Sequence, residues 1–134
     1  LIITSELLKR LVFPLRLDYV HATRYHDETE GQEQLVWRVM PEAYLENNTV
    51  LVIDDIFDRG KTLAAVVDAC QQAGAESVYS CVLVQKELSI ARRDTDYQPD
   101  FIGASVPDRY VFGVGIDYKG YFRNEKAIYA LKSS

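Results

Sequence analysis

The spacing of apolar and polar residues divides the chain into helices and strands joined by polar segments. Apolar residues three and four positions apart predict a helix over residues 6–12, which Pro14 ends. A loose alternation over residues 15–22 predicts a strand, and residues 35–40 predict a strand that returns from the polar, acidic segment 23–34. Because long loops inside compact domains usually have a function, we expect segment 23–34 to be functional or mobile.

The middle of the chain has the pattern of a parallel strand–helix–strand unit. Residues 50–53 are apolar on both faces, as in a buried parallel strand, and the predicted strand spans residues 49–54. A helix over residues 62–73, which Gly74 ends, leads to a strand over residues 78–84 that is rich in β-branched side chains. Such units have a right-handed crossover. We therefore expect an α/β fold, with a mostly parallel twisted sheet flanked by helices.

The rest of the pattern is less regular and is compatible with one domain. After residue 86 come a polar loop, short strands and a tail rich in aromatic residues, so we expect a small C-terminal hood from about residue 87 to residue 134. The hood would lie over the edge of the sheet where ligands bind. At 134 residues, the chain is predicted to be a single domain over residues 1–134. A doubly wound sheet normally has one more strand ahead of the first hairpin, so we expect the N-terminal part of the domain to be missing.

Composition and charge exclude several classes of function. With 15 basic and 20 acidic residues the net charge is −5, so no basic surplus is present to neutralise a nucleic-acid backbone. No apolar run in the sequence reaches the roughly 18 residues of a membrane span. Cys70 and Cys81 make no disulfide or metal framework, and we expect both to be reduced, buried and structural in a cytoplasmic protein. His21 and His26 lack zinc-ligand spacing and are interpreted as structural or solvated.

The most informative stretch is residues 50–62, with the sequence VLVIDDIFDRGKT. Asp54 and Asp55 follow the apolar strand directly, at the sheet edge where open α/β sheets bind ligands. Gly60 permits a tight turn, so the N–H groups of residues 58–62 (the phosphate loop) and the next helix N-terminus can face a phosphate. The two carboxylates can accept hydrogen bonds from the vicinal hydroxyls of a sugar. This pattern is typical of a site for a phosphorylated sugar.

Other interpretations of this stretch stay open when the residues are considered alone. Asp54 and Asp55 could be a metal-binding pair of a nucleotide hydrolase, or a solvated strand end. Residues 60–62, Gly-Lys-Thr, occur in P-loops, but a P-loop requires a glycine five residues before Gly60. That position is Asp55, so a P-loop is excluded.

The whole stretch resembles the ribose-phosphate signature of the type I phosphoribosyltransferases, and within them that of the hypoxanthine(-guanine) enzymes. A second stretch, residues 99–123, is similar in order and spacing to the purine-binding hood of the enzymes that act on 6-oxopurines. A third, residues 17–25, resembles the strand that leads into their mobile catalytic loop. The resemblance covers essentially the whole chain and implies the type I phosphoribosyltransferase fold, in which the missing N-terminal segment also carries a pyrophosphate loop.

The resemblance implies an enzyme of purine salvage, a pentosyltransferase that depends on Mg²⁺. It would transfer 5-phosphoribosyl from phosphoribosyl pyrophosphate to hypoxanthine or guanine, giving IMP or GMP and pyrophosphate. The implied partners are phosphoribosyl pyrophosphate and a 6-oxopurine, with no nucleic acid and no membrane, in a homodimer or homotetramer. Two alternatives are a phosphoribosyltransferase for xanthine, adenine or a pyrimidine, and a non-catalytic sensor of phosphoribosyl pyrophosphate. Lys86, Tyr110 and Asp117 together favour the 6-oxopurine enzyme.

The resemblance also implies roles for the residues of the phosphoribosyl site. Asp54 and Asp55 would hold the ribose hydroxyls, directly or through Mg²⁺, and Asp58 would be the general base that faces N7 of the purine. The residues expected to bind the 5-phosphate, mainly through N–H groups and a terminal hydroxyl, are Asp58, Arg59, Gly60, Lys61 and Thr62. We expect the Arg59 side chain to point to solvent and Lys61 to be a solvated residue at the helix start.

Roles at the purine and pyrophosphate sites are implied in the same way. Lys86 would point at the 6-oxygen of the purine, Tyr110 would stack on the ring, and Val111 would offer backbone groups to the ring edge. Asp117 would bind a second Mg²⁺ near the pyrophosphate. Arg123 would contact the pyrophosphate directly.

Arg24 and Tyr25 lie where the mobile loop of the family closes over the reaction centre. Closure of that loop would exclude water and so suppress hydrolysis. Arg24 replaces a serine common in many relatives, so we expect the detailed contacts of this loop to differ.

Overall fold

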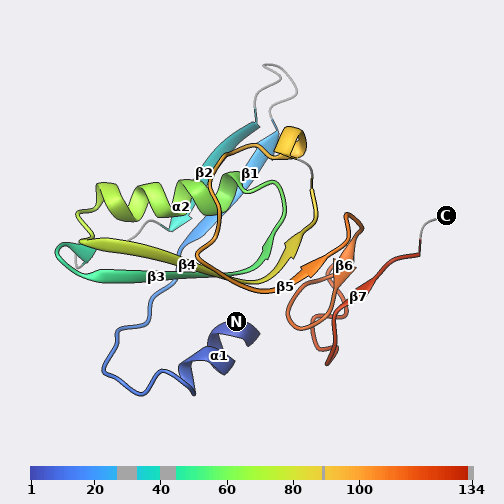
Figure 1. Cartoon of the computed structure of the whole chain (residues 1–134), viewed down its shortest axis with the longest axis horizontal. Helices are drawn as coiled ribbons and strands as arrows, with labels where there is room; N and C mark the ends of the chain where they lie inside the picture. Colours follow the sequence, from blue (N-terminus) through green and yellow to red (C-terminus); the bar gives the residue numbers. More distant parts are fainter. Residues whose placement is uncertain (27–32, 40–44, 89, 133–134) are drawn as a thin grey trace.

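The sheet that carries residues 50–62 has three parallel strands. The computed structural model describes residues 1–26, 33–39, 45–88 and 90–132. β3 (Thr49–Phe57), β4 (Ser77–Lys86) and β5 (Phe101–Val106) pair in that order, and their carboxyl ends meet at one edge of the sheet. The mostly parallel α/β arrangement predicted from the sequence is confirmed (Figure 1).

Helix α2 (Lys61–Gln72) connects β3 to β4 and covers one face of the sheet (Figure 1). Its buried side chains recur every three or four residues and form one apolar stripe: Leu63, Val66, Val67 and Cys70. Gly74 has φ +88° and lies one residue beyond the helix cap, where its N–H donates to the carbonyl of Gln71. This left-handed glycine ends the helix as predicted.

Two groups of buried side chains make the core around the sheet edge. The group beneath α2 consists of Phe57, Leu63 and Val82. The group at the carboxyl end of the sheet consists of Val84, Val111 and Ile116. Phe57, the last residue of β3, is only 1% exposed. Its burial in the core fixes the position at which the following loop begins. Both cysteines are free, as expected, although Cys81 is half-buried and only Cys70 is fully buried.

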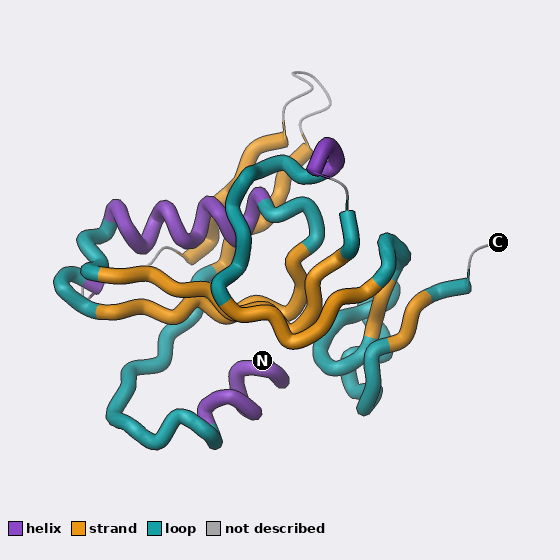
Figure 2. The backbone as a smooth tube through the Cα atoms, in the orientation of Figure 1, coloured by secondary structure: helices purple, strands orange, loops and turns teal. Residues whose placement is uncertain are grey.

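The residues expected to form the hood take two different places. β5 joins the sheet as its edge strand, and residues 107–132 form a small unit beyond its carboxyl end (Figure 2). In this unit β6 (Val111–Phe112) pairs antiparallel with β7 (Tyr129–Ala130). Phe112 stacks on Tyr129 with ring centroids 5.6 Å apart. The unit therefore lies beside the edge of the sheet where ligands are expected.

The helix predicted over residues 6–12 is placed wrongly. α1 spans Ile2–Leu8 and lies against β3. After it the N–H of Arg10 donates to the carbonyl of Leu7 at 2.8 Å, which is the tighter turn that often closes a helix. The helix therefore stops well before Pro14. No helix in the described ranges is long and apolar enough to cross a bilayer.

The strand predicted over residues 15–22 is also wrong, except at residues 21–22. Residues 11–20 have no regular structure, and several of their apolar side chains are exposed. β1 (His21–His26) begins only where the chain can pair with the antiparallel β2 (Glu33–Val39). Alternation of apolar residues does not make a strand unless a partner strand accepts its hydrogen bonds.

The acidic segment 23–34, expected to be a loop, is strand at both ends. Residues 23–26 belong to β1 and residues 33–34 to β2, whereas residues 27–32 lie outside the described part of the chain. Arg24 and Tyr25 are therefore in a strand rather than a loop, and their side chains lie outside the described part.

Candidate active site

The acidic pair Asp54 and Asp55 lies inside β3 rather than after it. The ladder with β4 continues past both residues as far as Phe57 and Gln85, so the strand predicted to end at residue 54 extends to Phe57. Both carboxylates are half-buried, and the N–H of Asp55 donates to Asp54 Oδ1 at 2.8 Å. The sheet thus holds the backbone of both acids rigidly.

Two adjacent, half-buried carboxylates are electrostatically strained. Burial, followed by the negative charge of Asp55, raises the pKa of Asp54 to about 7. Desolvation disfavours the charged form of a carboxyl group, and a second negative charge nearby does the same. A cation or a set of hydroxyl donors would relieve this strain, so the pair can receive either a divalent cation or the hydroxyls of a sugar.

A hollow of about 270 Å³ (the acidic hollow) opens beside this pair. Its lining comes from one continuous stretch of the chain and consists of Asp54, Asp55, Ile56, Phe57, Asp58, Gly60, Thr62 and Leu63. The structure therefore brings the acidic pair together with three residues of the phosphate loop, Asp58, Gly60 and Thr62. Arg59 and Lys61, the other two residues of that loop, are not in this lining.

Gly60 fixes the shape of the phosphate loop. It is the N-cap of α2 and has φ +90°, a conformation that side-chain-bearing residues rarely adopt. A Cβ atom at this position would lie 2.7 Å from Phe57 Cζ and 2.7 Å from Thr95 Cγ2. Glycine therefore lets the loop pack closely on its support at the start of α2, and a helix N-terminus favours an anion.

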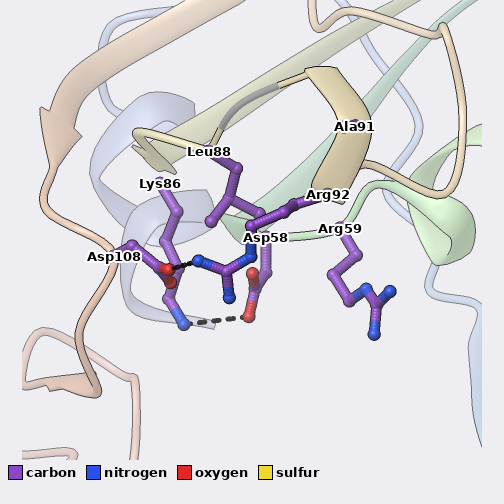
Figure 3. Close-up of a pocket in the computed structure, with 7 residues that line it drawn as sticks. All are labelled: Asp58, Arg59, Lys86, Leu88, Ala91, Arg92 and Asp108. Atoms are coloured by element: carbon purple, nitrogen blue, oxygen red, sulfur yellow. Dashed lines mark hydrogen bonds and ion pairs between the residues drawn. The ribbon is translucent and has the colours of Figure 1, made fainter.

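A second hollow, of about 310 Å³ (the Lys86 hollow), adjoins Asp58. It is lined by Asp58, Arg59, Lys86, Leu88, Ala91, Arg92 and Asp108 (Figure 3). Lys86 Nζ donates to Asp58 Oδ2 at 2.9 Å, and the Lys86 side chain is only 14% exposed. Asp58 lines both hollows, so its carboxylate lies where ligands in the two hollows would meet.

Two residues that the sequence analysis did not single out form an ion pair at the Lys86 hollow. Arg92 belongs to the short helix η2 (Ile90–Arg92), and Asp108 follows β5. Figure 3 shows their side chains pointing toward each other above the Lys86–Asp58 pair. Both follow the carboxyl end of a strand at short distance, and charged residues in such positions are the signal that could have identified them.

Two residues of the phosphate loop differ in part from expectation. Arg59 is 57% exposed, as predicted, but its guanidinium also pairs with the Asp94 carboxylate at 3.0 Å. This contact anchors the loop to the segment after η2. Lys61, expected to be solvated, is the first residue of α2 and is half-buried.

The hood residues expected to bind purine and pyrophosphate form a cluster of their own. Tyr110 Oη donates to the carbonyl of Asp117 at 2.9 Å, and Arg123 pairs with the Asp117 carboxylate at 2.9 Å. Tyr110 is 49% exposed, as a residue that stacks on a ligand has to be, whereas the Val111 side chain is 3% exposed and belongs to the core. None of these four residues lines either hollow, so their roles toward a ligand stay predictions.

The carboxylates do not form a complete metal cage. In the described ranges, no group of three or more His, Cys, Asp or Glu side chains lies close enough to hold an ion. Mg²⁺ commonly binds through one or two carboxylates together with substrate phosphates and water. The oxygen-only donor pair of Asp54 and Asp55 fits that mode of binding.

Comparison with known proteins decides the family. The family model of the phosphoribosyl transferase domain matches residues 1–128. The chain belongs to the phosphoribosyltransferase family. This phosphoribosyltransferase is 31% identical over 129 residues to the hypoxanthine-guanine phosphoribosyltransferase of Staphylococcus epidermidis, covering 96% of the chain and 70% of that protein. It is 32% identical over 130 residues to the enzyme of the same name from Staphylococcus aureus, again covering 96% of the chain and 70% of the relative.

Solved structures agree with this assignment. The phosphoribosyltransferase superposes on the crystal structure of a hypoxanthine phosphoribosyltransferase from Staphylococcus aureus with a TM-score of 0.79 and 30% sequence identity. The match covers 98% of the chain and 70% of that structure. The type I phosphoribosyltransferase fold inferred by resemblance is therefore confirmed.

Proposed function

We propose that this phosphoribosyltransferase transfers 5-phosphoribosyl from phosphoribosyl pyrophosphate to hypoxanthine or guanine, in purine salvage. The products would be IMP or GMP and pyrophosphate. The observation that carries the proposal is the pair formed by Lys86 and Asp58, a donor and an acceptor 2.9 Å apart where the two hollows meet. The relatives named hypoxanthine-guanine phosphoribosyltransferase, at 31% and 32% identity, support this choice of base.

The acidic hollow is the place for the ribose 5-phosphate. The N–H groups of the phosphate loop and the N-terminus of α2 would bind the phosphate, because a helix N-terminus favours an anion. Asp54 and Asp55 would accept hydrogen bonds from the ribose hydroxyls, and the Thr62 hydroxyl would contact the phosphate. Such a site acts by positioning the sugar and by stabilising charge, and it needs no covalent intermediate.

Mg²⁺ fits the residues beside this hollow. Burial, and after it the negative charge of Asp55, raises the pKa of Asp54, and a divalent cation beside the pair would favour the ionised form. Asp54 and Asp55 would hold one ion together with substrate oxygens, and Asp117 would hold a second. When bound, Mg²⁺ would neutralise the negative charge of the departing pyrophosphate.

The Lys86 hollow is the place for the purine. An ammonium group has donors and no acceptor, so Lys86 suits the 6-oxygen of hypoxanthine or guanine. The Asp58 carboxylate would accept the N7 proton as the purine N9 bonds to the ribose and pyrophosphate leaves. Tyr110 would stack on the ring and Val111 would offer its backbone to the ring edge.

The remaining roles concern pyrophosphate, closure and assembly. Arg123 would contact the pyrophosphate, and Arg24 and Tyr25 would contribute to the segment that closes over the substrates. The whole chain would act as one domain. A homodimer or homotetramer is proposed from the family, and light scattering after size-exclusion chromatography would measure it.

One assay tests the proposal. The protein is mixed with Mg²⁺ and phosphoribosyl pyrophosphate, each nucleobase is offered in turn, and nucleotide formation is followed by absorbance. We expect turnover with hypoxanthine or guanine. Turnover with only adenine or only a pyrimidine would assign the enzyme to another base, and turnover with no base at all would refute catalysis.

A further inference from the structure

Arg93 joins the ends of the two strands that carry the Lys86–Asp58 pair. Its Nη1 donates to the carbonyl oxygen of Asp58 at 2.9 Å, and its Nη2 donates to the carbonyl oxygen of Lys86 at 2.8 Å. The guanidinium also lies over the Phe57 ring, 4.5 Å from the ring centroid. One side chain therefore contacts the last residue of β3, the residue after it, and the last residue of β4.

The two residues after Arg93 contact the same loop. The N–H of Asp94 donates to the carbonyl of Arg59 at 2.9 Å, in addition to the ion pair between their side chains. Thr95 packs against Gly60, so closely that a Cβ added to Gly60 would lie 2.7 Å from the Thr95 methyl group. Residues 93–95 thus contact each residue from 57 to 60 and form a support for the phosphate loop.

We propose that Arg93 is a positioning residue that fixes the distance between Asp58 and Lys86, an inference that rests on the proposed function. The ladder between β3 and β4 ends at Phe57 and Gln85. Beyond that point, the described contacts that join the two strands are the Lys86–Asp58 ion pair and the Arg93 bridge. A purine bound to Lys86 and Asp58 replaces their ion pair with its own contacts. The Arg93 bridge then holds the two backbones in place while the base enters and the nucleotide leaves.

The position requires arginine rather than another cation. The planar guanidinium presents several N–H donors in a fixed fork, so two of its nitrogens can reach two different carbonyl oxygens at once. A lysine ammonium is a single point on a flexible stem and does not reproduce this bridge. Arg93 lines neither hollow, and it therefore acts through the backbone of its neighbours instead of touching a substrate.

The test is a double-mutant cycle on kcat with hypoxanthine and saturating phosphoribosyl pyrophosphate. We expect Arg93→Gln to lower kcat about 10²-fold, the usual effect of a small misplacement at a reaction centre. If Arg93 acts by placing Asp58, Arg93→Gln should add little to the loss already caused by Asp58→Asn. Unchanged kcat in Arg93→Gln, or losses that multiply in the double variant, would overturn the proposal. Arg10→Gln, at a side chain that is 71% exposed, is the matched control and should retain wild-type kcat.

Arg93→Lys separates the bridge from the charge. Its kcat should fall nearly as far as that of Arg93→Gln, since the charge is kept and the bridge is lost. Wild-type kcat in Arg93→Lys would overturn the proposal. If only Arg93→Gln fails to fold, the cycle is run with Arg93→Lys. If neither variant folds, Arg93 is a folding residue and the positioning role is refuted.

Hydrogen–deuterium exchange decides the question without turnover. The amides of residues 57–63 should exchange faster in Arg93→Gln than in the wild type, while those of α1 should not change. Unchanged exchange at residues 57–63 would count against the bridge. A wild-type protein that makes no nucleotide from any base would refute the proposed function, and the exchange measurement would still test the role of Arg93.

Discussion

Lys86 and Asp58 form an ion pair of 2.9 Å between the carboxyl ends of two neighbouring parallel strands. The two partners differ in access, because the Lys86 side chain is 14% exposed and the Asp58 side chain is 44% exposed. A largely buried ammonium is unfavourable without an acceptor. A ligand that takes the place of Asp58 therefore has to offer Lys86 another acceptor. A 6-oxo group does so, and a 6-amino group does not.

The first prediction is strong discrimination against adenine. A site built around one buried polar group discriminates against a ligand that leaves this group unpaired, and the discrimination is a factor on the order of 10⁴ in kcat/KM. Rates with hypoxanthine and adenine, measured side by side, check this. Lys86→Met should reduce the discrimination, whereas Lys9→Met, at a side chain that is 64% exposed, should not. Comparable kcat/KM for the two bases would rule out this role of Lys86.

The second prediction concerns the Asp58 carboxylate as general base. Asp58→Asn keeps the size of the side chain and removes its basicity, so kcat should fall by about 10²–10⁴-fold. The affinity for phosphoribosyl pyrophosphate should change little, since Asp54, Asp55 and the loop amides remain. Asp68→Asn on the exposed side of α2 is the control. A kcat within about fivefold of wild type would make Asp58 a turn residue, and lost donor binding would assign it to the phosphate site.

The third prediction is a pH dependence of donor binding. Because the pKa of Asp54 is raised to about 7, the ionised form that binds a cation is lost on acidification through neutral pH. As the pH drops below that pKa, the affinity for phosphoribosyl pyrophosphate with Mg²⁺ should therefore decrease, by up to about tenfold per pH unit. Titration calorimetry between about pH 8 and pH 6 measures this effect. Equal affinity across the range would contradict it, and Asp54→Asn should bind more weakly with a flatter pH dependence.

The raised pKa of Asp54 also predicts how the stability of the ligand-free protein varies with pH. An aspartate in an unfolded chain titrates at about 3.9. Between about pH 3.9 and about pH 7, Asp54 carries a proton in the folded protein but has lost it in the unfolded chain. The contribution of Asp54 to the free energy of unfolding therefore falls as the pH rises through this window. Asp54→Asn should raise Tm at about pH 8 and change it little at about pH 4. An equal change at both pH values would contradict the shift.

The fifth prediction separates backbone strain from crowding at Gly60. Gly60→Ala forces alanine into a positive φ and places its Cβ 2.7 Å from Phe57 and Thr95. Gly120→Ala is a matched control, because Gly120 has φ +84° and nothing lies within 4 Å of an added Cβ. Both variants should lose roughly 1 kcal/mol or more through strain. Only Gly60→Ala should also raise KM for phosphoribosyl pyrophosphate, and equal effects of both variants on KM would show that crowding at Gly60 is unimportant.

The middle of the fold could be predicted from the sequence because its signals are local. The apolar run before Asp54, the stripe on α2 and the left-handed Gly74 are each set within a few residues. The acidic pair and the phosphate loop were predicted for the same reason, since they lie on one continuous stretch. Lys86 was found only through the resemblance, because its partner Asp58 is 28 residues away.

Other features depend on contacts that a sequence pattern does not contain. Residues 15–22 alternate like a strand, but residues 15–20 remain irregular, since β2 pairs only from His21 onward. In the sequence, Asp54 and Asp55 have the pattern of a strand end, but in the structure β3 and β4 stay paired beyond them. Arg93 is one of several charged residues in a polar loop. Its importance follows from two carbonyl oxygens that the fold brings within its reach.

Asp58 is the one residue that the linings of the two hollows share. Apart from Arg59 of the phosphate loop, which lines the Lys86 hollow, the remaining residues divide, with Leu88, Ala91 and Arg92 on one side and the acidic pair on the other. Under the proposed function, nucleobase preference can therefore change by substitution in one small group of residues, without altering those that recognise the sugar phosphate. Substitutions on the base side, in evolution or by engineering, can therefore change the base specificity while the donor site stays intact.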